Sequence, residues 1–322
     1  MDEPPNRAAR HIDTDGGVDD ALALVMLARS GVKIAAVSSV FGNTWVDQAA
    51  CNANMVLRQS LCAADVYVGA GVGLSGFAPE RGQRGHGQDG LNGQGGSFRR
   101  KLPLLQQTHG VSRLAVAPQY GLRGLFLGPL TNLANALLDD PAAFRGWRPL
   151  VMAGAFEVEG RGAEGADFNT WSDREAMQRV LLNGVAPRLV PLDVTSRILL
   201  RRDVFMARAA ASEWPLMHRL ARAAGPYMDF HAKVWGGDGC RPHDAVAAAA
   251  ILWPDLFTFE AVRLGLDPER RGRLRREDGP VNAELCVGVD AEAVEARMLA
   301  AFFDGAPAVG AALEIEAPIT SP

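Results

Sequence analysis

Short apolar runs alternate with segments of helical periodicity along most of this chain, and this alternation constrains the fold more than any other feature. In the first half, the strand-like runs and the helix candidates between them span 32–40, 47–61, 65–71, 122–128 and 131–141. The second half repeats the pattern with RPLVMAG, DREAMQRVLLNG and PRLVPLDVT. Such alternation is typical of an open, mostly parallel sheet flanked by helices. No low-complexity linker divides the halves, so we expect one α/β domain over residues 1–322.

The composition gives no reason to expect a partner that is nucleic acid or membrane. The formal net charge is -4 over 322 residues, and the one dense basic run, RRGRLRRED from Arg270, is expected to be a solvated turn. The N-terminus lacks an apolar signal segment, and no apolar run reaches the ~18 residues of a membrane span. We therefore expect a cytoplasmic protein. Scattered cysteines without a C-x-x-C pair predict reduced thiols and argue against zinc; they are Cys51, Cys62, Cys240 and Cys286.

Four aspartates crowd into the segment HIDTDGGVDDALALVML near the start of the chain: Asp13, Asp15, Asp19 and Asp20. Like charges raise one another's pKa values, so a folded cluster of this kind needs a cation, a shared proton or full solvation. The apolar flanks argue against solvation. RHI is expected to end a strand, DTDGG to turn, and DDALALVMLARSG to form a helix closed by Gly31. In such a sheet, the carboxyl end of a strand is where ligands bind.

Helix capping explains only part of this cluster. Asp19 and Asp20 would lie near a helix N-terminus, where the macrodipole favours carboxylates, but capping uses one or two acids and leaves the other two unexplained. Aspartate oxygens without cysteine or paired histidine favour a hard cation, calcium or magnesium. An EF-hand does not fit, because Gly17 stands where a third ligand belongs.

Two family patterns compete for the opening motif. A phosphatase of the haloacid dehalogenase type also begins with a strand ending in D-x-D, uses magnesium, and would take Asp13 as its nucleophile. In this chain, however, Gly17 holds the place of that family's Thr or Val, and a double aspartate at 19–20 has no role in its chemistry. The string DTDGGVDDALAL instead resembles the D-x-D-x-G-x-D-D signature of the nucleoside hydrolases, the inosine–uridine-preferring N-ribohydrolase family.

The resemblance to nucleoside hydrolases continues downstream in the expected order. The matching stretches are VSSVFGNT, GHGQDGLNG, LGPLTNLA, LVMAGAF, ADFNTWSDREAM and RPHDAVAAAA. Together they span nearly the whole chain. The resemblance implies a Rossmann-like α/β fold, hydrolysis of the N-glycosidic bond of ribonucleosides to free base and ribose, and a homo-oligomer, either a dimer or a tetramer.

The same resemblance implies a calcium ion held by Asp15, Asp20, Asp244 and the backbone carbonyl of Leu127. Calcium takes 6–8 oxygen ligands, which leaves room for ribose hydroxyls and a water. Asp15 is then the candidate general base on that water, positioned with help from Asn43. The clustered charge at the start of the chain would thus serve to hold a dication that also binds the sugar.

Breaking an N-glycosidic bond passes through an oxocarbenium-like transition state and leaves negative charge on the departing base. By resemblance, His243 is the candidate acid for that base. Ribose hydroxyls are expected to be held by Asp19, Asp167 and Asn169, with Asn43 and Asp244 beside them and Met152 beneath the sugar. Met152 is otherwise a core residue. His86, within the glycine-rich segment 80–97, either contacts the base or has no role, and this segment is expected to be a functional or mobile loop.

The chain departs from the family pattern at the 5′ end of the ribose. Arg161 replaces the usual asparagine, and Asp167 replaces a longer glutamate. Either a different, charged 5′ substituent is accepted there, or the alignment of this loop has shifted. Ala245 also replaces a proline. Asp13 is expected to bond backbone amides of its loop rather than to touch metal or ligand. A further alternative is a binding protein that keeps the metal and ribose site without turnover.

Overall fold

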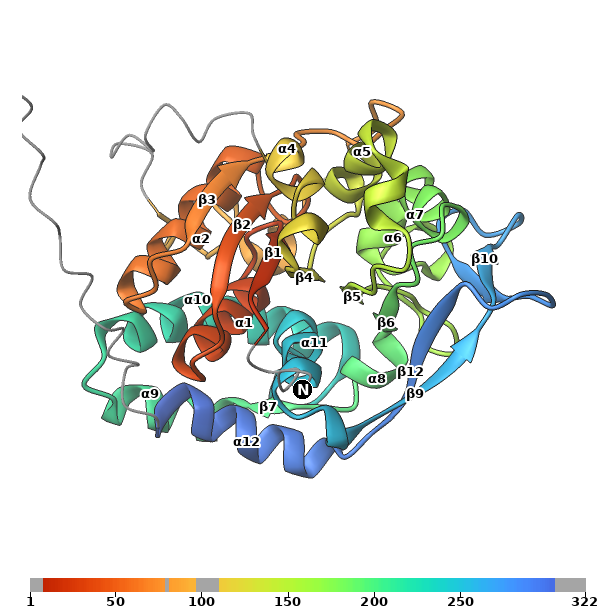
Figure 1. The fold of residues 1–322 in the computed structure, drawn as a ribbon. Coiled ribbons are helices and arrows are strands. Elements are labelled where there is room, and N and C mark those ends of the chain that lie inside the picture. Colours follow the sequence, from red (N-terminus) through yellow and green to blue (C-terminus); the bar gives the residue numbers. More distant parts are fainter. Residues whose placement is uncertain (1–7, 79–80, 97–109, 305–322) are drawn as a thin grey trace, which may run out of the picture.

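An eight-stranded sheet with the order β3-β2-β1-β4-β5-β6-β12-β9 forms the centre of the protein (Figure 1). The computed structural model describes residues 8–78, 81–96 and 110–304. Every neighbouring pair in the sheet is parallel except β12 and β9, which run antiparallel. The strands are β1 (Arg10–Thr14), β2 (Ile34–Ser39), β3 (Asp65–Val68), β4 (Arg123–Phe126), β5 (Leu150–Met152), β6 (Arg188–Val190), β9 (Phe257–Val262) and β12 (Ala283–Val289).

Helices cover both faces of this sheet, which confirms the open, mostly parallel α/β fold. One hydrophobic cluster packs α1 (Val18–Arg29), α2 (Val46–Gln59), α10 (Pro215–Trp235), α11 (His243–Leu252) and α12 (Ala291–Phe303) against one face. A second cluster packs α4 (Gly110–Ala115), α5 (Thr131–Asp139) and α7 (Arg174–Leu182) against the other. The remaining helices are α3 (Gln83–His86), α6 (Phe168–Ser172), α8 (Leu192–Thr195) and α9 (Arg202–Ala211).

Strand β1 lies at the centre of the sheet and is buried. Helices α1 and α11, which pack against each other beside it, are buried along most of their length. All five residues of β1 are buried, as expected for a central parallel strand. Helix α1 begins after Gly17, is buried through Ala28, and is followed by Gly31 at φ +73°, so the predicted helix and its glycine stop are confirmed. Helix α11 packs against α1 and consists mainly of buried alanines. The side chains at the first turns of both helices therefore meet.

Two parts of the chain differ from the sequence-based expectation. The opening strand continues through Asp13 and Thr14 instead of ending at Ile12. The basic run from Arg270 is only partly a solvated turn, because β10 (Leu264–Leu266) pairs with β11 (Leu274–Arg276) and Arg273 is buried against Phe156 and Glu159. A second small ladder joins β7 (Leu200–Arg201) to β8 (Gly239–Cys240).

The parallel strands all present their carboxyl ends at one edge of the sheet. In the sheet, β2 and β3 lie on one side of β1, and the next strand along the chain, β4, lies on its other side. The order of the strands thus reverses beside β1, which makes this the topological switch point. The segments that follow β1, β2, β4 and β5 contain four of the predicted site residues: Asp15, Asn43, Leu127 and Asp167. Among the described helices, none is both long and apolar enough to cross a membrane.

Candidate active site and metal centre

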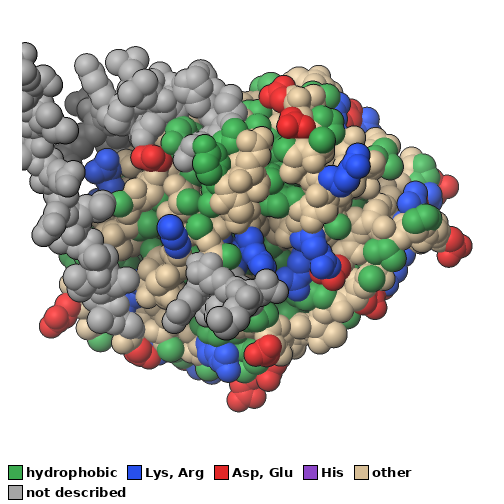
Figure 2. All heavy atoms as spheres, viewed as in Figure 1, with side chains coloured by type: hydrophobic (Ala, Val, Ile, Leu, Met, Phe, Trp, Pro, Cys, Tyr) green, Lys and Arg blue, Asp and Glu red, His purple; other side chains and the backbone are tan. Residues whose placement is uncertain are grey.

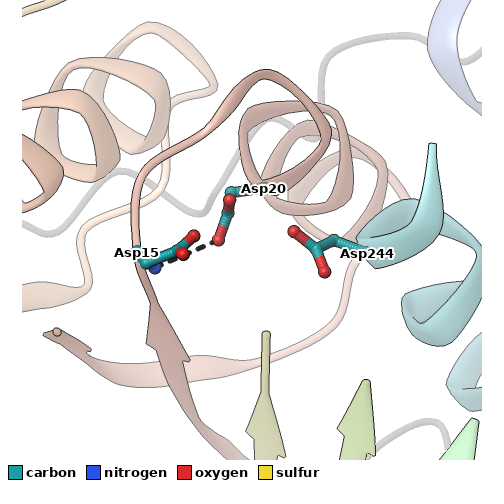
Figure 3. A group of neighbouring side chains, drawn as sticks. All are labelled: Asp15, Asp20 and Asp244. Atoms are coloured by element: carbon teal, nitrogen blue, oxygen red, sulfur yellow. Dashed lines mark hydrogen bonds between the residues drawn. The ribbon is translucent and has the colours of Figure 1, made fainter. Parts of the chain in front are cut away.

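Three predicted ligands meet at the carboxyl edge of the sheet (Figure 3). Asp15 follows β1, Asp20 lies in the first turn of α1, and Asp244 lies in the first turn of α11. One carboxylate oxygen from each lies within 4.8 Å of the others, and all three side chains are buried. The structure thus brings together three carboxylates that the sequence separates widely.

Backbone amides hold Asp20 in place. Its Oδ2 accepts a hydrogen bond of 2.8 Å from the backbone N–H of Gly17, which is the N-cap of α1. Its Oδ1 accepts one of 3.3 Å from the N–H of Asp15 and another from the Thr14 hydroxyl. The capping interpretation is therefore right for Asp20 but incomplete, because a cap needs no second and third carboxylate beside it.

Asn43 fixes the orientation of Asp15 with two hydrogen bonds. Its backbone N–H donates to Asp15 Oδ2 at 2.9 Å, and its Nδ2 donates to Asp15 Oδ1 at 2.8 Å. The close contact between Asn43 and the Asp15 carboxylate requires glycine at two positions. A Cβ on Gly42 would lie 2.0 Å from Asp15 Oδ2, and a Cβ on Gly17 would lie 2.6 Å from Asn43 Nδ2. Glycine in both positions keeps the carboxylate and the amide in contact.

The electrostatics of the cluster favour a cation. Burial raises the pKa of Asp15 well above its usual range, and the charge of Asp20 raises it further. Burial also raises the pKa of Asp244, with additional repulsion from Asp19 and Asp20. A buried group of like charges is stable only when it is neutralised, and an oxygen-only donor set suits a hard divalent ion. The residues present therefore fit a metal ion of that kind.

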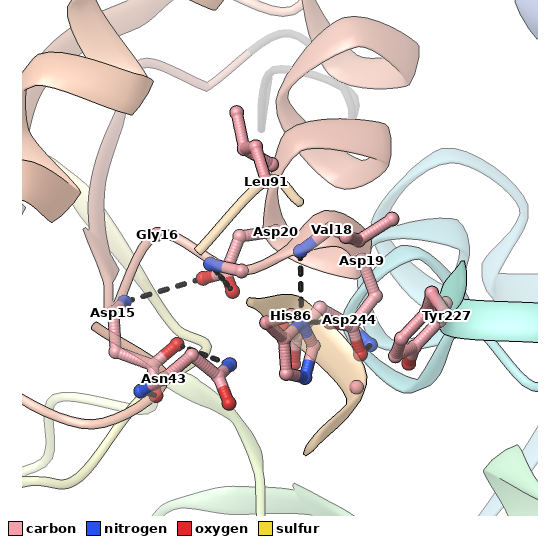
Figure 4. A network of polar contacts seen from close by, with 12 residues as sticks. Asp15, Gly16, Val18, Asp19, Asp20, Asn43, His86, Leu91, Tyr227 and Asp244 are labelled. Carbon is pink, nitrogen blue, oxygen red and sulfur yellow. Dashed lines mark hydrogen bonds and ion pairs between the residues drawn. The ribbon is translucent and has the colours of Figure 1, made fainter. Parts of the chain in front are cut away.

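A cavity adjoins the carboxylate cluster and shares Asp244 with it. It encloses about 540 Å³ of space, part of it open to solvent. Nine of the predicted residues line it: Asp19, Asn43, His86, Leu127, Met152, Arg161, Asp167, Asn169 and His243, besides Asp244. Figure 4 shows how Asp19, His86 and Tyr227 lie beside the cluster.

His86 is buried at 4% exposure and is not the surface-loop histidine that was the alternative. Its Nδ1 accepts a hydrogen bond of 3.0 Å from the backbone N–H of Val18, so Nε2 carries the proton of the neutral ring (Figure 4). Burial lowers the pKa of His86 to about 3, helped by Arg161 and His243. The described part of the loop, 81–96, is tied to the motif through Asn52, whose Nδ2 donates to the carbonyls of Gly16 and Asp89.

His243 lies at the start of α11, and only one of its two ring nitrogens has a hydrogen-bond partner among the described residues. Its Nδ1 lies 2.7 Å from the Thr195 hydroxyl, whereas its Nε2 is buried without a hydrogen-bond partner among the described residues. Burial lowers the pKa of His243 to about 3, with further repulsion from Arg241 and Arg161. The ring is therefore neutral at pH 7, and when Thr195 donates to Nδ1 the ring's only proton lies on Nε2.

Asn169 and Asp167 form a polar wall of the cavity. Asn169 Nδ2 donates to the carbonyl of Leu127 at 2.8 Å and to that of Met152 at 3.1 Å. The Leu127 carbonyl, a predicted metal ligand, thus already accepts one hydrogen bond and has one lone pair left. Asp167 caps α6 through Oδ1, which accepts from Thr170 N at 2.9 Å, while its Oδ2 is buried without a partner among the described residues.

Arg161 lies at the rim of this cavity. It is exposed, and its guanidinium lies 4.2 Å from the centroid of the Phe230 ring. Met152 is buried and also lines the cavity, so its two interpretations, as a core residue and as a residue of the site, are compatible.

Asp13 does not bond the backbone amides of its loop, so this expectation is wrong. Its carboxylate is fully buried within β1, and Oδ2 accepts hydrogen bonds from the Ser38 hydroxyl and, at 2.6 Å, from Asn132 Nδ2. Burial raises the pKa of Asp13 to about 7. Because the strand extends past Ile12, the side chain of Asp13 points to the face of the sheet that α5 covers, where Asn132 lies, and Asp13 is not among the cavity residues.

Sequence reasoning missed an aromatic wall on α10. Tyr227, His231 and Trp235 follow one another at intervals of four residues, so they share one face of the helix, and all three line the cavity. The ring centroids of His231 and Trp235 lie 5.7 Å and 5.3 Å from that of His243. The spacing within YMDFHAKVW was the signal that could have identified this face.

The sequence from residue 11 to residue 296 matches the family model of the inosine-uridine preferring nucleoside hydrolases. The chain belongs to this family. It is 30% identical over 263 residues to a probable uridine nucleosidase 2 of Oryza sativa subsp. japonica, covering 80% of this chain and 77% of that protein. It is 27% identical over 302 residues to the non-specific ribonucleoside hydrolase RihC of Salmonella agona (strain SL483), covering 88% and 95%.

The fold of this nucleoside hydrolase agrees with solved structures. A plant nucleoside hydrolase, the PpNRh1 enzyme, superimposes with a TM-score of 0.83 at 23% identity, covering 93% of this chain and 99% of that one. A purine-preferring ribonucleoside hydrolase from Gardnerella vaginalis gives 0.82 at 22% identity, covering 91% and 98%. The family match and the curated relatives, rather than this likeness of fold, make the chain an enzyme for the hydrolysis of ribonucleoside N-glycosidic bonds. The burial of Asp13 also speaks against the phosphatase alternative, which needs that residue as an accessible nucleophile.

We predict that Asp13→Ala lowers the free energy of unfolding by about 1–3 kcal/mol, because it leaves the Ser38 hydroxyl and the Asn132 amide without their buried acceptor. Urea denaturation followed by circular dichroism measures this. Asp13→Asn, which keeps one acceptor oxygen, should lose less. An alanine variant that is as stable as the wild type and yet inactive would show that Asp13 acts in the chemistry.

Proposed function

We propose that this nucleoside hydrolase depends on calcium and that Asp15, Asp20 and Asp244 hold the ion, with the Leu127 carbonyl as a further ligand. The observation that carries the proposal is the meeting of three buried carboxylates beside a cavity lined by polar side chains. Calcium suits this donor set because it tolerates several oxygen ligands in flexible geometry. When bound, the ion supplies Lewis-acid chemistry, since it lowers the pKa of water and attracts oxygens of the sugar.

Asp15 accepts the proton of the attacking water in this proposal. Its two oxygens are held by Asn43, so the carboxylate is already oriented before substrate arrives. A base that is fixed in this way needs little reorganisation when the proton moves, which is a general requirement for efficient proton transfer. Asn43 is then a positioning residue for the base and, as a cavity residue, a contact for substrate.

Asp19, Asp167 and Asn169 bind the ribose hydroxyls, and Met152 packs beneath the ring. The Asp19 Oδ1 and Asp167 Oδ2 atoms are buried without hydrogen-bond partners among the described residues, and both side chains line the cavity. Such atoms are costly unless a ligand supplies a donor, and a ribose hydroxyl is one. The same carboxylates stabilise the positive charge that spreads over the ribose ring in the transition state.

His243 gives its Nε2 proton to the departing base. The support is geometric, because Nδ1 is engaged by Thr195 while Nε2 is without a partner in the cavity wall. Burial lowers the pKa of His243, so the resting ring is neutral; it must take up a second proton from solvent before it acts, because a neutral imidazole is too weak an acid to protonate the base. Negative charge on the leaving base favours this transfer. His86 contacts the base from the neighbouring loop, with its Nε2 hydrogen as donor.

Arg161 and Asp167 set what the site accepts at the 5′ position of the ribose. Arg161 stands at the rim of the cavity, and its guanidinium can bind a phosphate through two parallel hydrogen bonds. A 5′-hydroxyl needs only neutral partners. The chemistry of this rim therefore favours a negatively charged 5′ substituent more than an asparagine would.

Removal of the metal should abolish the release of base from inosine or uridine. After exhaustive chelation, calcium should restore the rate better than zinc, and Asp20→Asn should prevent that restoration because one of three carboxylate ligands is lost. Chromatography of the free base measures this. Asp47→Asn, at an exposed acid on α2, is the matched control. Full activity in a verified metal-free preparation would contradict the proposal, and calcium binding without any release of base would favour a binding protein.

His243→Ala should slow inosine hydrolysis by roughly 10²–10⁴-fold, the usual contribution of a general acid. A p-nitrophenyl riboside has a leaving group that departs as a stable anion, so its hydrolysis should be nearly unchanged. Steady-state kcat for the two substrates measures the difference. Because His243 adjoins Asp244, a damaged metal site would slow both substrates together, and equal losses would reject His243 as the acid.

Arg161→Asn should reduce the ratio of kcat/KM for a nucleoside 5′-monophosphate over that for the nucleoside by about tenfold or more, because one charge-assisted contact is lost. Arg58→Asn removes the same charge from an exposed position outside the cavity wall and should leave the ratio unchanged. An unchanged ratio for Arg161→Asn would mean that this side chain only packs on Phe230.

A further inference from the structure

A second cavity lies at the opposite edge of the sheet, where the parallel strands begin. It encloses about 810 Å³ of space, part of it open to solvent. Four arginines line it: Arg10, Arg123 and Arg188 are the first residues of β1, β4 and β6, and Arg148 precedes β5. Figure 2 shows Lys and Arg side chains gathered near the centre of one face, over the region of β4, β5 and β6 in Figure 1.

The register of the sheet accounts for this gathering of positive charge. Arg10 lies directly opposite Arg123 across the β1–β4 pair, and Arg188 lies opposite Leu150 across the β5–β6 pair. Neighbouring strands are about 4.8 Å apart, so the first residues of adjacent strands are close together. Strand β1 rises about 3.3 Å per residue, which places Arg10 roughly 16 Å from Asp15. The cavity is therefore separate from the active site.

Among the described residues that line this cavity, arginines outnumber acidic residues. Glu284 is the one acid in the described lining, and it is shared by Arg148 Nη2 and, at 2.9 Å, Arg188 Nε. Arg123 forms no ion pair with any described residue. Arg10 is only 5% exposed. Its pKa is lowered to about 10 by burial and by repulsion from Arg123 and Arg188, so these cations destabilise one another.

The remaining walls are apolar. They come from Leu150 and from the C-terminal end of α11 and the turn after it, at Ala250, Ile251 and Pro254. Guanidinium groups held between apolar walls and near one another are stabilised by a bound anion that several of them can share. The planar guanidinium matches two oxygens of a phosphate at once, which an ammonium cannot do.

We propose that this cavity binds a small anion carrying a phosphate group, held by the guanidinium groups of Arg123, Arg148 and Arg188 at the starts of β4, β5 and β6. The site is distinct from the one that hydrolyses nucleosides, and the reaction there neither needs nor releases phosphate. Occupancy places negative charge beside Arg123, Arg148 and Arg188. The anion therefore stabilises the folded protein in proportion to its binding.

Calorimetric titration of the full-length protein with inorganic phosphate, at ionic strength held constant with sodium chloride, tests this proposal. The wild type should bind phosphate saturably. The double variant Arg123→Gln/Arg148→Gln should bind it at least tenfold more weakly, since each guanidinium–phosphate contact is charge-assisted. Both side chains are exposed, so the variant keeps its core, and thermal unfolding without phosphate checks this.

Two controls make the result specific to the cavity. Arg58→Gln/Arg201→Gln removes the same charge from exposed positions elsewhere and should bind phosphate as the wild type does. Arg161→Gln should keep the phosphate binding that Arg123→Gln/Arg148→Gln loses, because Arg161 lines the active-site cavity and not this one. Equal weakening in both double variants, loss of binding in Arg161→Gln alone, or no saturation below about 10 mM phosphate would each overturn the proposal. None of these outcomes depends on nucleoside hydrolysis.

Discussion

Mutual repulsion among buried carboxylates is the constraint on which the rest of this site depends. Asp15, Asp20 and Asp244 bring oxygens within 4.8 Å of one another in the protein interior, and burial and neighbouring charge raise the pKa values of Asp15 and Asp244. Two local features reduce this cost. The backbone N–H groups of Gly17 and Asp15, just before α1, donate to Asp20, and Asn43 donates two hydrogen bonds to Asp15. The remaining charge calls for a cation.

The sheet and two central helices supply the geometry that this arrangement requires. Asp19 and Asp244 are 225 residues apart in sequence, yet the backbone N–H of Asp244 lies 3.5 Å from Asp19 Oδ2. They meet because α1 and α11 pack side by side and begin at the same edge of the sheet. The small side chains of α11 permit this close packing. The same edge receives the ends of β2, β4 and β5, which provide the walls of the cavity.

The sequence predicted most of the fold and much of the site, because both depend on local patterns. The alternation of strand-like and helix-like segments predicted the parallel sheet. The motif DTDGGVDD predicted the carboxylates that lie after β1 and in the first turn of α1. Features that depend on long-range packing were not predictable in the same way. Asp13 accepts hydrogen bonds from Ser38 and Asn132 because β1 extends to Thr14, and the side-chain amide of Asn169 donates to the carbonyls of Leu127 and Met152. The aromatic face of α10 had the right spacing, but only the tertiary structure shows that it lines the cavity.

The most direct test of the account is anomalous X-ray diffraction from crystals of the calcium-loaded protein. The account predicts one strong anomalous difference peak between the carboxylates of Asp15, Asp20 and Asp244, with the Leu127 carbonyl among the ligands at about 2.3–2.6 Å. The same preparation should release free base from inosine. A preparation that releases base while its crystals show no peak between these carboxylates would contradict the account.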